Sequence, residues 1–223
     1  MQKRLKKNLY WLSVSIAAIS VIALILSESG MADTFPNTHL YRMERTGVWS
    51  IRFLLLSLAM SPLYRLLGWR WTLKLRKPLG LWAFFFGAWH FMTYINNQSI
   101  DDALKTIFDN QYYLLGFIGL SILFVLALTS HPIAMRRLRH NWKRLHRLVY
   151  LAGILVIMHS ILMFGNTKSS FLKDAGFVNE LKLYLVIIGI LFVLRFSRVQ
   201  RIIHQIIGKP KRRYKPKTML QSS

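Results

Sequence analysis

Apolar residues along this chain gather in long blocks and do not alternate with polar residues at the period of a half-buried helix or strand. Six of these blocks approach the length of about 20 residues that a helix needs to cross a bilayer. They run over Leu9–Leu26, Ser50–Leu67, Leu79–Ile95, Tyr112–Thr129, Leu145–Phe164 and Leu181–Phe196. The pattern predicts an all-α membrane protein, a bundle of six transmembrane helices.

The composition agrees with a membrane protein, because 53% of the 223 residues are hydrophobic and soluble domains of this length are less apolar. The first block follows a basic stretch, as a signal peptide does, with Lys3, Arg4, Lys6 and Lys7. However, its apolar run exceeds the usual length of about 7–15 residues, and "LSESGMADTF" offers a poor cleavage site. We therefore expect this block to stay in place as the first membrane span.

The charges separate into two sets of loops. Basic residues cluster before the first block, in "YRLLGWRWTLKLRKP", in "HPIAMRRLRHNWKRLHR" and in "RFSRVQRIIHQIIGKPKRRYKPK". The alternate loops hold every acidic residue, namely Glu28, Asp33, Glu44, Asp101, Asp102, Asp109, Asp174 and Glu180. Positively charged loops stay in the cytoplasm, so the pattern predicts that both termini are cytoplasmic.

The net charge of +23 does not indicate a nucleic-acid partner, because the aromatic residues lie inside the predicted spans and not on a soluble basic face. We expect one membrane domain over residues 1–208 and a disordered basic cytoplasmic tail over 209–223 that contacts anionic lipid. The chain has no cysteine, which excludes iron–sulfur and disulfide chemistry. We find no internal repeat, no nucleotide-binding motif and no loop long enough for a second domain.

Three histidines lie in or at the edge of predicted spans: His90, His146 and His159. Ionisable or metal-binding side chains are costly there and usually face the interior of the bundle. His90 and His159 are expected at similar depth, toward the outer face, on two helices that run in the same direction. Two such imidazoles can bind one haem iron from opposite sides. The other histidines are expected to be solvated or at headgroup level, namely His39, His131, His140 and His204.

His146 precedes His159 by 13 residues, which corresponds to about 20 Å along a helix axis. This distance is too long for one metal ion and suits a second redox centre near the inner face. Alternatively, His146 is an interfacial side chain and no ligand. The third span offers Arg76 and Lys77 at this level in place of a histidine, so the second ligand of an inner site could be His131, His140, water or another ligand.

Small residues repeat along one face of the third span, at Gly80, Ala83 and Gly87, on the side that carries His90. A flat macrocycle needs a helix surface without side chains beside its ligand, so this stripe is expected to make room for the haem. Small residues also serve simply to bring membrane helices close together, and both interpretations stay open.

The stretches "RTGVWSIRFLLLSLAMSPL", "LRKPLGLWAFFFGAWHFMTY" and "ALTSHPIAMRRLRHNWKRLHRLVYL", with "HS" at 159–160, resemble the ferric reductase-like transmembrane superfamily. Within it, they are most similar to the haem-binding membrane subunits of periplasmic methionine sulfoxide reductase systems. The resemblance implies that His90, His146 and His159 are haem ligands. NADPH oxidases of this superfamily carry four such histidines, and this chain lacks the fourth.

The same resemblance implies an electron-transfer subunit, and not a complete enzyme, in a bacterial inner membrane. Electrons would come from quinol or a cytosolic flavin reductase and pass through one or two haem b groups, with FMN as a further cofactor. The acceptor would be a periplasmic molybdenum-cofactor reductase that repairs oxidised methionines. Four cations are placed to pair with haem propionates or a flavin phosphate, although topology alone also explains them: Arg76, Lys77, Arg144 and Arg147.

Two other functions are compatible with the sequence. One is a stand-alone cytochrome b that reduces ferric iron or oxygen at the outer face without a protein partner. The other is a proton-coupled transporter that uses the histidines as relays, which would call for carboxylates within the membrane and discontinuous helices in repeated halves.

Overall fold

The computed structural model is helical throughout the residues it describes, which are 2–30, 38–96, 98–166, 177–194 and positions 199, 201, 202 and 205. The helices are α1 (Gln2–Gly30), α2 (Thr38–Leu67), α3 (Thr72–Ile95), α4 (Ile100–Asp109), α5 (Gln111–Leu128), α6 (Pro132–Leu145), α7 (Leu148–Asn166) and α8 (Phe177–Val193). The all-α class predicted from the sequence is confirmed.

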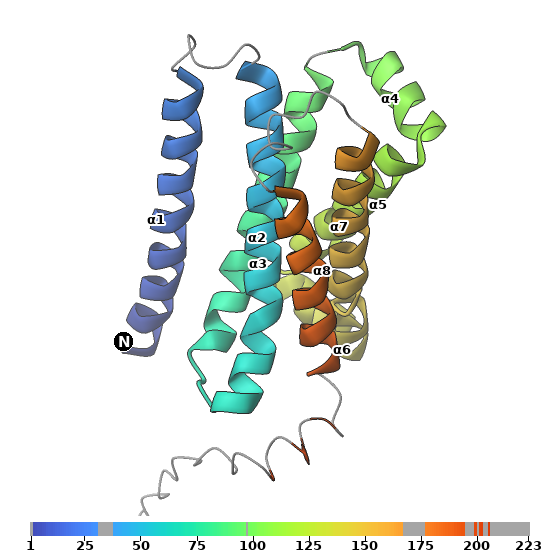
Figure 1. Ribbon diagram of the computed structural model, residues 1–223. Helices are drawn as coiled ribbons and strands as arrows, with labels where there is room; N and C mark the ends of the chain where they lie inside the picture. Colours follow the sequence, from blue (N-terminus) through green and yellow to red (C-terminus); the bar gives the residue numbers. More distant parts are fainter. Residues whose placement is uncertain are drawn as a thin grey trace, which may run out of the picture.

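Four long helices form the centre of the molecule (Figure 1). α2 packs along α3, α5 packs along α7, and the two pairs join through contacts of α3 with α5 and of α2 with α7. α1 covers α2 and α3 from outside, and α8 lies against α2 and α7. α1 begins and α8 ends at the same end of the bundle (Figure 1).

α2 and α3 approach each other closely because small and hydroxyl side chains line their contact. The hydroxyl of Ser50 donates to the carbonyl of Ala83 at 2.8 Å, and that of Ser57 donates to the carbonyl of Arg76 at 2.9 Å. A Cβ atom added at Gly87 or Gly80 would lie 3.1 or 3.3 Å from these same serine hydroxyls. The small stripe predicted on α3 therefore packs against α2, as small residues do between membrane helices.

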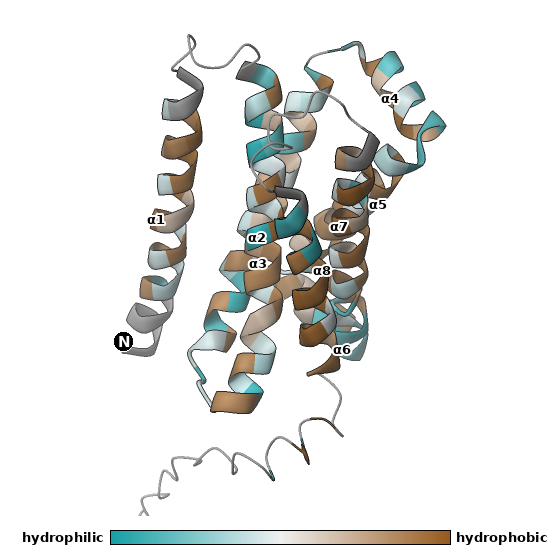
Figure 2. Cartoon of the chain, in the orientation of Figure 1, coloured by the Kyte–Doolittle hydropathy of each residue, from teal (hydrophilic) through white to brown (hydrophobic). Residues whose placement is uncertain are grey.

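The outer surface of the bundle is apolar, as lipid contact requires. Figure 2 shows hydrophobic residues along most of α1, α5, α7 and α8, and hydrophilic residues gathered on α4 and α6. α1, α2 and α5 are long and apolar enough to cross a membrane, and the bent pair α6–α7 passes the same test as one broken span. The chain is a multi-pass membrane protein with three or four such spans among its described residues. α8 covers 17 residues, fewer than the about 20 that a span needs.

Basic residues are concentrated at one end of the bundle, and the described aspartates lie at the other. The turn between α2 and α3 lies at the same end as α6 (Figure 1), and both are basic, with Arg65, Arg70, Lys74, Arg136, Arg137, Lys143 and Arg144. Three aspartates lie on or beside α4 at the other end. The loops around Asp33 and Asp174, His204 and the predicted tail over 209–223 lie outside the described residues.

The structure corrects two details of the predicted elements. The helix of the predicted span Leu145–Phe164 begins three residues later than predicted, at Leu148. α6 ends at Leu145, with a bend of 53° between it and α7, so His146 lies in the break and not inside the span. The second detail is α4, which the sequence analysis did not identify because ten residues are too few for a membrane span. Its start does carry a local signal, since the Ser99 hydroxyl accepts from the backbone N–H of Asp102 at 3.1 Å.

Candidate functional site

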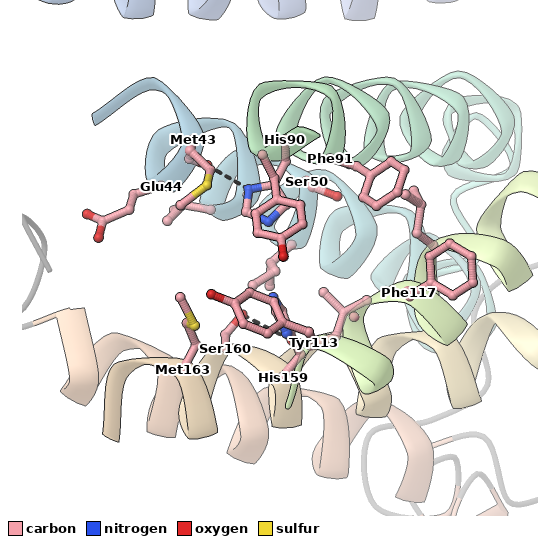
Figure 3. A pocket seen from close by; sticks show the side chains of 18 of the residues that line it. Met43, Glu44, Ser50, His90, Phe91, Tyr113, Phe117, His159, Ser160 and Met163 are labelled. Carbon is pink, nitrogen blue, oxygen red and sulfur yellow. Dashed lines mark hydrogen bonds between the residues drawn. The ribbon is translucent and has the colours of Figure 1, made fainter. Parts of the chain in front are cut away.

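Two imidazoles face each other across a cavity between the central helices. His90 comes from α3 and His159 from α7, and their ring centres lie 6.3 Å apart with planes inclined by 74°. Figure 3 shows the two rings on opposite walls of this cavity, which we call the outer cavity. The structure thus brings together the two histidines that the sequence analysis expected at similar depth.

Each of these imidazoles is held by a backbone carbonyl of the neighbouring helix. His90 Nδ1 lies 2.7 Å from the carbonyl oxygen of Met43 on α2, and His159 Nδ1 lies 2.7 Å from that of Tyr112 on α5. Because a carbonyl oxygen can only accept, Nδ1 carries the proton in both rings. Nε2 is then left with a lone pair, which is the form of histidine that binds a metal.

A glycine makes room for each ring. A Cβ atom at Gly47 on α2 would lie 3.0 Å from His90 Nδ1, and one at Gly116 on α5 would lie 2.9 Å from His159 Nδ1. Any larger residue would push the imidazole away from its carbonyl. The sequence analysis did not select these glycines, because only the contact between neighbouring helices distinguishes them from other glycines in the chain.

These contacts repeat at a constant spacing. Met43, Gly47 and His90 form one set, and Tyr112, Gly116 and His159, each 69 residues further along, form the other. The pairs α2–α3 and α5–α7 therefore present their histidines in the same way from opposite sides. The sequence analysis found no repeat, because the equivalence lies in backbone contacts and in a few positions and not in overall similarity.

The histidine pair fits a haem iron. Two imidazoles bound on opposite sides of one metal through bonds of about 2 Å have ring centres roughly 6 Å apart, close to the observed separation. Among the described residues there is no group of three or more histidine, cysteine or acidic side chains that could hold a bare metal ion. A macrocycle that supplies the remaining ligands matches such a pair.

The outer cavity has a volume of about 130 Å³ and is partly open at its edge, and typical ligand sites measure about 300–1000 Å³. A bound macrocycle would therefore extend beyond the cavity or displace some of its lining side chains. Phe91 and Phe117, whose ring centres are 5.9 Å apart, lie on one side of the cavity in Figure 3. Their packing joins α3 to α5, so movement there would widen the space between the two histidine-bearing pairs.

A buried tyrosine hydroxyl at the outer cavity has no partner within the described part of the chain. It belongs to Tyr94, which lines the cavity on α3 one turn beyond His90. Its ring packs against Tyr113 with centres 5.2 Å apart. Buried hydroxyls are rarely left unpaired, and a carboxylate such as a haem propionate would supply the missing acceptor.

His146 lines a different cavity at the basic end, which we call the inner cavity and which encloses about 310 Å³. Its ring packs against that of Trp142, with centres 4.1 Å apart and planes inclined by 30°, and its Nε2 lies 3.2 Å from the Thr129 hydroxyl. That hydroxyl already donates to the carbonyl of Val125 at 2.7 Å, so Nε2 is the donor to it. His146 therefore differs from the facing pair, whose Nε2 atoms carry lone pairs.

None of the other described histidines lines the inner cavity. His131 and His140 are exposed on α6, and His39 is exposed at the start of α2. The cations predicted near His146 divide into two groups. Lys77 and Arg76 line the inner cavity, where Lys77 Nζ donates to the Ser130 carbonyl at 2.8 Å, whereas Arg144 and Arg147 are exposed and lie outside the cavity wall.

The small stripe on α3 runs along the helix from the wall of one cavity to the wall of the other. Gly87 lines the outer cavity, Gly80 lines the inner one, and Ala83 between them is fully buried. The stripe thus contributes to both cavity walls while it packs against the serines of α2.

Comparison with known proteins identifies a family and several relatives. The family described as ferric reductase like transmembrane component matches residues 46–157, a stretch that includes His90 and His146 and ends just before His159. Over 123 residues the chain is 39% identical to the protein-methionine-sulfoxide reductase heme-binding subunit MsrQ of Xanthomonas euvesicatoria pv. vesicatoria, covering 52% of this chain and 55% of the relative.

Two further relatives carry the same name. The MsrQ protein of Azospira oryzae is 38% identical over 117 residues, with 51% of this chain and 50% of the relative covered. That of Herminiimonas arsenicoxydans is 38% identical over 120 residues, with 52% and 55% covered. The chain thus spans about half the length of the curated relatives it matches. No solved structure matches it.

Proposed function

The chain belongs to the ferric reductase like transmembrane component family, and from this premise we propose that it is a haem b subunit that carries electrons across a bacterial inner membrane. The observation that supports this most strongly is the facing pair His90 and His159, whose ring centres are 6.3 Å apart. The printed names of the relatives, which call them heme-binding subunits, support it further.

A haem held there would supply one-electron redox chemistry. His90 and His159 would bind its iron through Nε2, while the carbonyls of Met43 and Tyr112 hold Nδ1 and keep each ring in one orientation. The Tyr94 hydroxyl would donate to a propionate. The mostly apolar lining would limit the access of water to the iron, and two protein ligands would favour electron transfer over substrate binding at the metal.

The inner cavity is the proposed point of electron entry. Lys77 and Arg76 line it and can attract an anionic donor or a cofactor carboxylate or phosphate. A quinol or a cytosolic flavin reductase would deliver electrons there. His146 would bind a second haem only after Nε2 leaves the Thr129 hydroxyl. FMN, implied by the resemblance alone, remains a prediction.

The proposed topology has six spans with both termini in the cytoplasm, so that the basic end of the bundle faces the cytoplasm and the α4 end faces the periplasm. The proposed acceptor is a periplasmic molybdenum-cofactor methionine sulfoxide reductase, in line with the name of the relatives. A haem in the outer cavity would then be the last redox centre of this chain before the electron passes to that partner.

Absorption spectra of the purified protein test the cofactor. We expect sharp low-spin bands on reduction, and we expect them to be lost in both His90→Ala and His159→Ala. Both variants must remain monodisperse in detergent for the comparison to hold. Full haem content and unchanged spectra in the two variants would exclude the proposed ligand pair.

The rate at which the reduced haem is reoxidised distinguishes an electron-transfer subunit with a protein partner from a stand-alone reductase. Haem reduced under anaerobic conditions should be reoxidised only when the periplasmic reductase and a methionine sulfoxide substrate are both added. Equally fast reoxidation by ferric chelates or oxygen without any protein would favour the stand-alone cytochrome. The transporter alternative gains no support from the outer cavity, where the carboxylate of Glu44 points away from both imidazoles (Figure 3).

A further inference from the structure

α4 is an amphipathic helix, and its side chains fall into three strips. Ala103 and Ile107 are buried, with 1% and 2% of their surface exposed. Ile100, Leu104 and Phe108 are exposed at 65%, 43% and 65%. The polar residues Asp101, Asp102, Lys105, Thr106 and Asp109 make up the rest of the helix.

The two apolar strips are adjacent. At about 100° per residue, Ala103, Ile107, Ile100, Leu104 and Phe108 follow one another around a single arc of about 140°. The polar residues occupy the remaining arc. The edge of the arc with Ala103 and Ile107 packs against the bundle. The edge with Leu104 and Phe108 is not covered by any part of the described structure.

From this arrangement we propose that α4 lies along the membrane interface, with Ile100, Leu104 and Phe108 inserted among lipid acyl chains and its carboxylates facing water. The helix has ten residues and is therefore about 15 Å long, too short to cross the bilayer but suited to lie in its surface. The proposal holds whichever side of the membrane this end faces.

Two observations favour lipid over a protein partner. The exposed strip lies on a helix that leads within two residues into the membrane span α5, which begins at Gln111 and itself exposes Ile118 and Phe124 at 40% and 48%. In addition, the polar residues of α4 lie on one side of the strip only. A protein-docking patch is usually ringed by polar residues, whereas an interfacial helix is divided into one apolar and one polar face.

The position of α4 matters for the outer cavity because the buried edge of the helix forms part of its wall. Ile107 lines that cavity together with Tyr113 and His90. A helix anchored in the membrane surface holds this wall in place, so the bilayer itself contributes to the shape of the site.

The natural absence of cysteine permits a direct test. Spin labels would be attached to single-cysteine variants in vesicles of phosphatidylethanolamine and phosphatidylglycerol, and their collisions with oxygen and with a water-soluble nickel chelate would be compared. We expect Leu104→Cys and Phe108→Cys to show high oxygen and low nickel accessibility, as the lipid-facing reference Phe124→Cys does. The matched controls Lys105→Cys and Asp109→Cys on the polar face should show the reverse.

Nickel accessibility at positions 104 and 108 equal to that at 105 would overturn the proposal. A label at 108 that is open to nickel in vesicles but protected when the periplasmic reductase is added would also overturn it, by identifying a protein-docking face. All four α4 positions are exposed in the structure, so labelling them is expected to leave the fold intact, which elution as a single species in detergent verifies.

Discussion

A backbone carbonyl and a glycine lie against each of the two facing imidazoles, and together they determine how each ring can turn. The carbonyls of Met43 and Tyr112 fix the proton on Nδ1, and Gly47 and Gly116 leave the space that each ring occupies. At the residue scale the site therefore depends on the two glycines, which carry no side chain, as well as on the two histidines.

We predict that Gly47→Ala and Gly116→Ala each weaken haem binding. The new methyl group would lie about 3 Å from Nδ1 and would push the ring off its carbonyl, so haem per protein should fall and the low-spin signal in electron paramagnetic resonance should change. Gly189→Ala is the control, because a Cβ there meets nothing within 4 Å. Equal haem content and identical spectra in all three variants would contradict a positioning role for the two glycines.

The Tyr94 hydroxyl gives a second prediction at this scale. It is buried without a partner among the described residues, and leaving a buried hydroxyl unpaired costs about 1–3 kcal/mol. Tyr94→Phe should therefore leave the haem-free protein as stable as before or slightly more stable, while it increases haem loss from the loaded protein. Thermal unfolding with and without haem measures both effects. A clear loss of stability in the haem-free form would mean that the hydroxyl has a protein partner.

At the scale of elements, the helices are joined by a small number of polar contacts within an apolar bundle. Serines tie α2 to the backbone of α3, and one ion pair ties α2 to α8. In that pair Arg52 Nη2 lies 2.7 Å from Glu180 Oε1, and Arg52 Nε donates to the Tyr184 hydroxyl at 2.9 Å. Tyr184 in turn donates to Glu180. α8 is short and apolar, and this cluster is its polar connection to α2 among the described residues.

Removing the acid should loosen α8. We predict that Glu180→Ala lowers the melting temperature in detergent, with a loss of about 1 kcal/mol, because the pair is partly exposed and therefore screened. The control Lys182→Ala changes an exposed neighbouring charge on the same helix and should have a much smaller effect. If both variants melt at the same temperature as the unaltered protein, the cluster does not hold α8 in place.

At the scale of the whole molecule, charge is separated between the two ends of an apolar bundle. The basic turn between α2 and α3 and basic α6 lie at one end, and α4 with its aspartates lies at the other (Figure 1). Such a distribution orients a protein in the membrane, because basic loops are retained in the cytoplasm.

Reporter fusions test this orientation. A periplasm-active phosphatase fused after Asn110 should be active, and the same reporter fused after Arg139 in α6 should be inactive. A cytoplasm-active fluorescent reporter at the same two positions should give the opposite result and serves as the control. Activity of the phosphatase at Arg139 would reverse the proposed topology and, with it, the proposed direction of electron flow.

Several features of this protein follow from the sequence by itself. Apolar blocks of nearly 20 residues predict membrane helices, because such long runs of leucine and isoleucine are unfavourable in water and because a helix satisfies its own backbone hydrogen bonds in lipid. His90 and His159 lie 11 and 14 residues from the starts of the predicted spans at Leu79 and Leu145, which places them at similar depth because each residue adds about 1.5 Å along a helix. The charge asymmetry and the family resemblance are also readable without coordinates.

Only the tertiary structure decided how these helices meet. It paired His90 with Met43 and Gly47, and His159 with Tyr112 and Gly116, which no local pattern marks because the partners lie on different helices. It also moved His146 out of a continuous span into the bend before α7, where Trp142 and Thr129 hold it. Contacts between helices depend on packing over the whole bundle, whereas periodicity along a chain reports only which face of each helix is apolar.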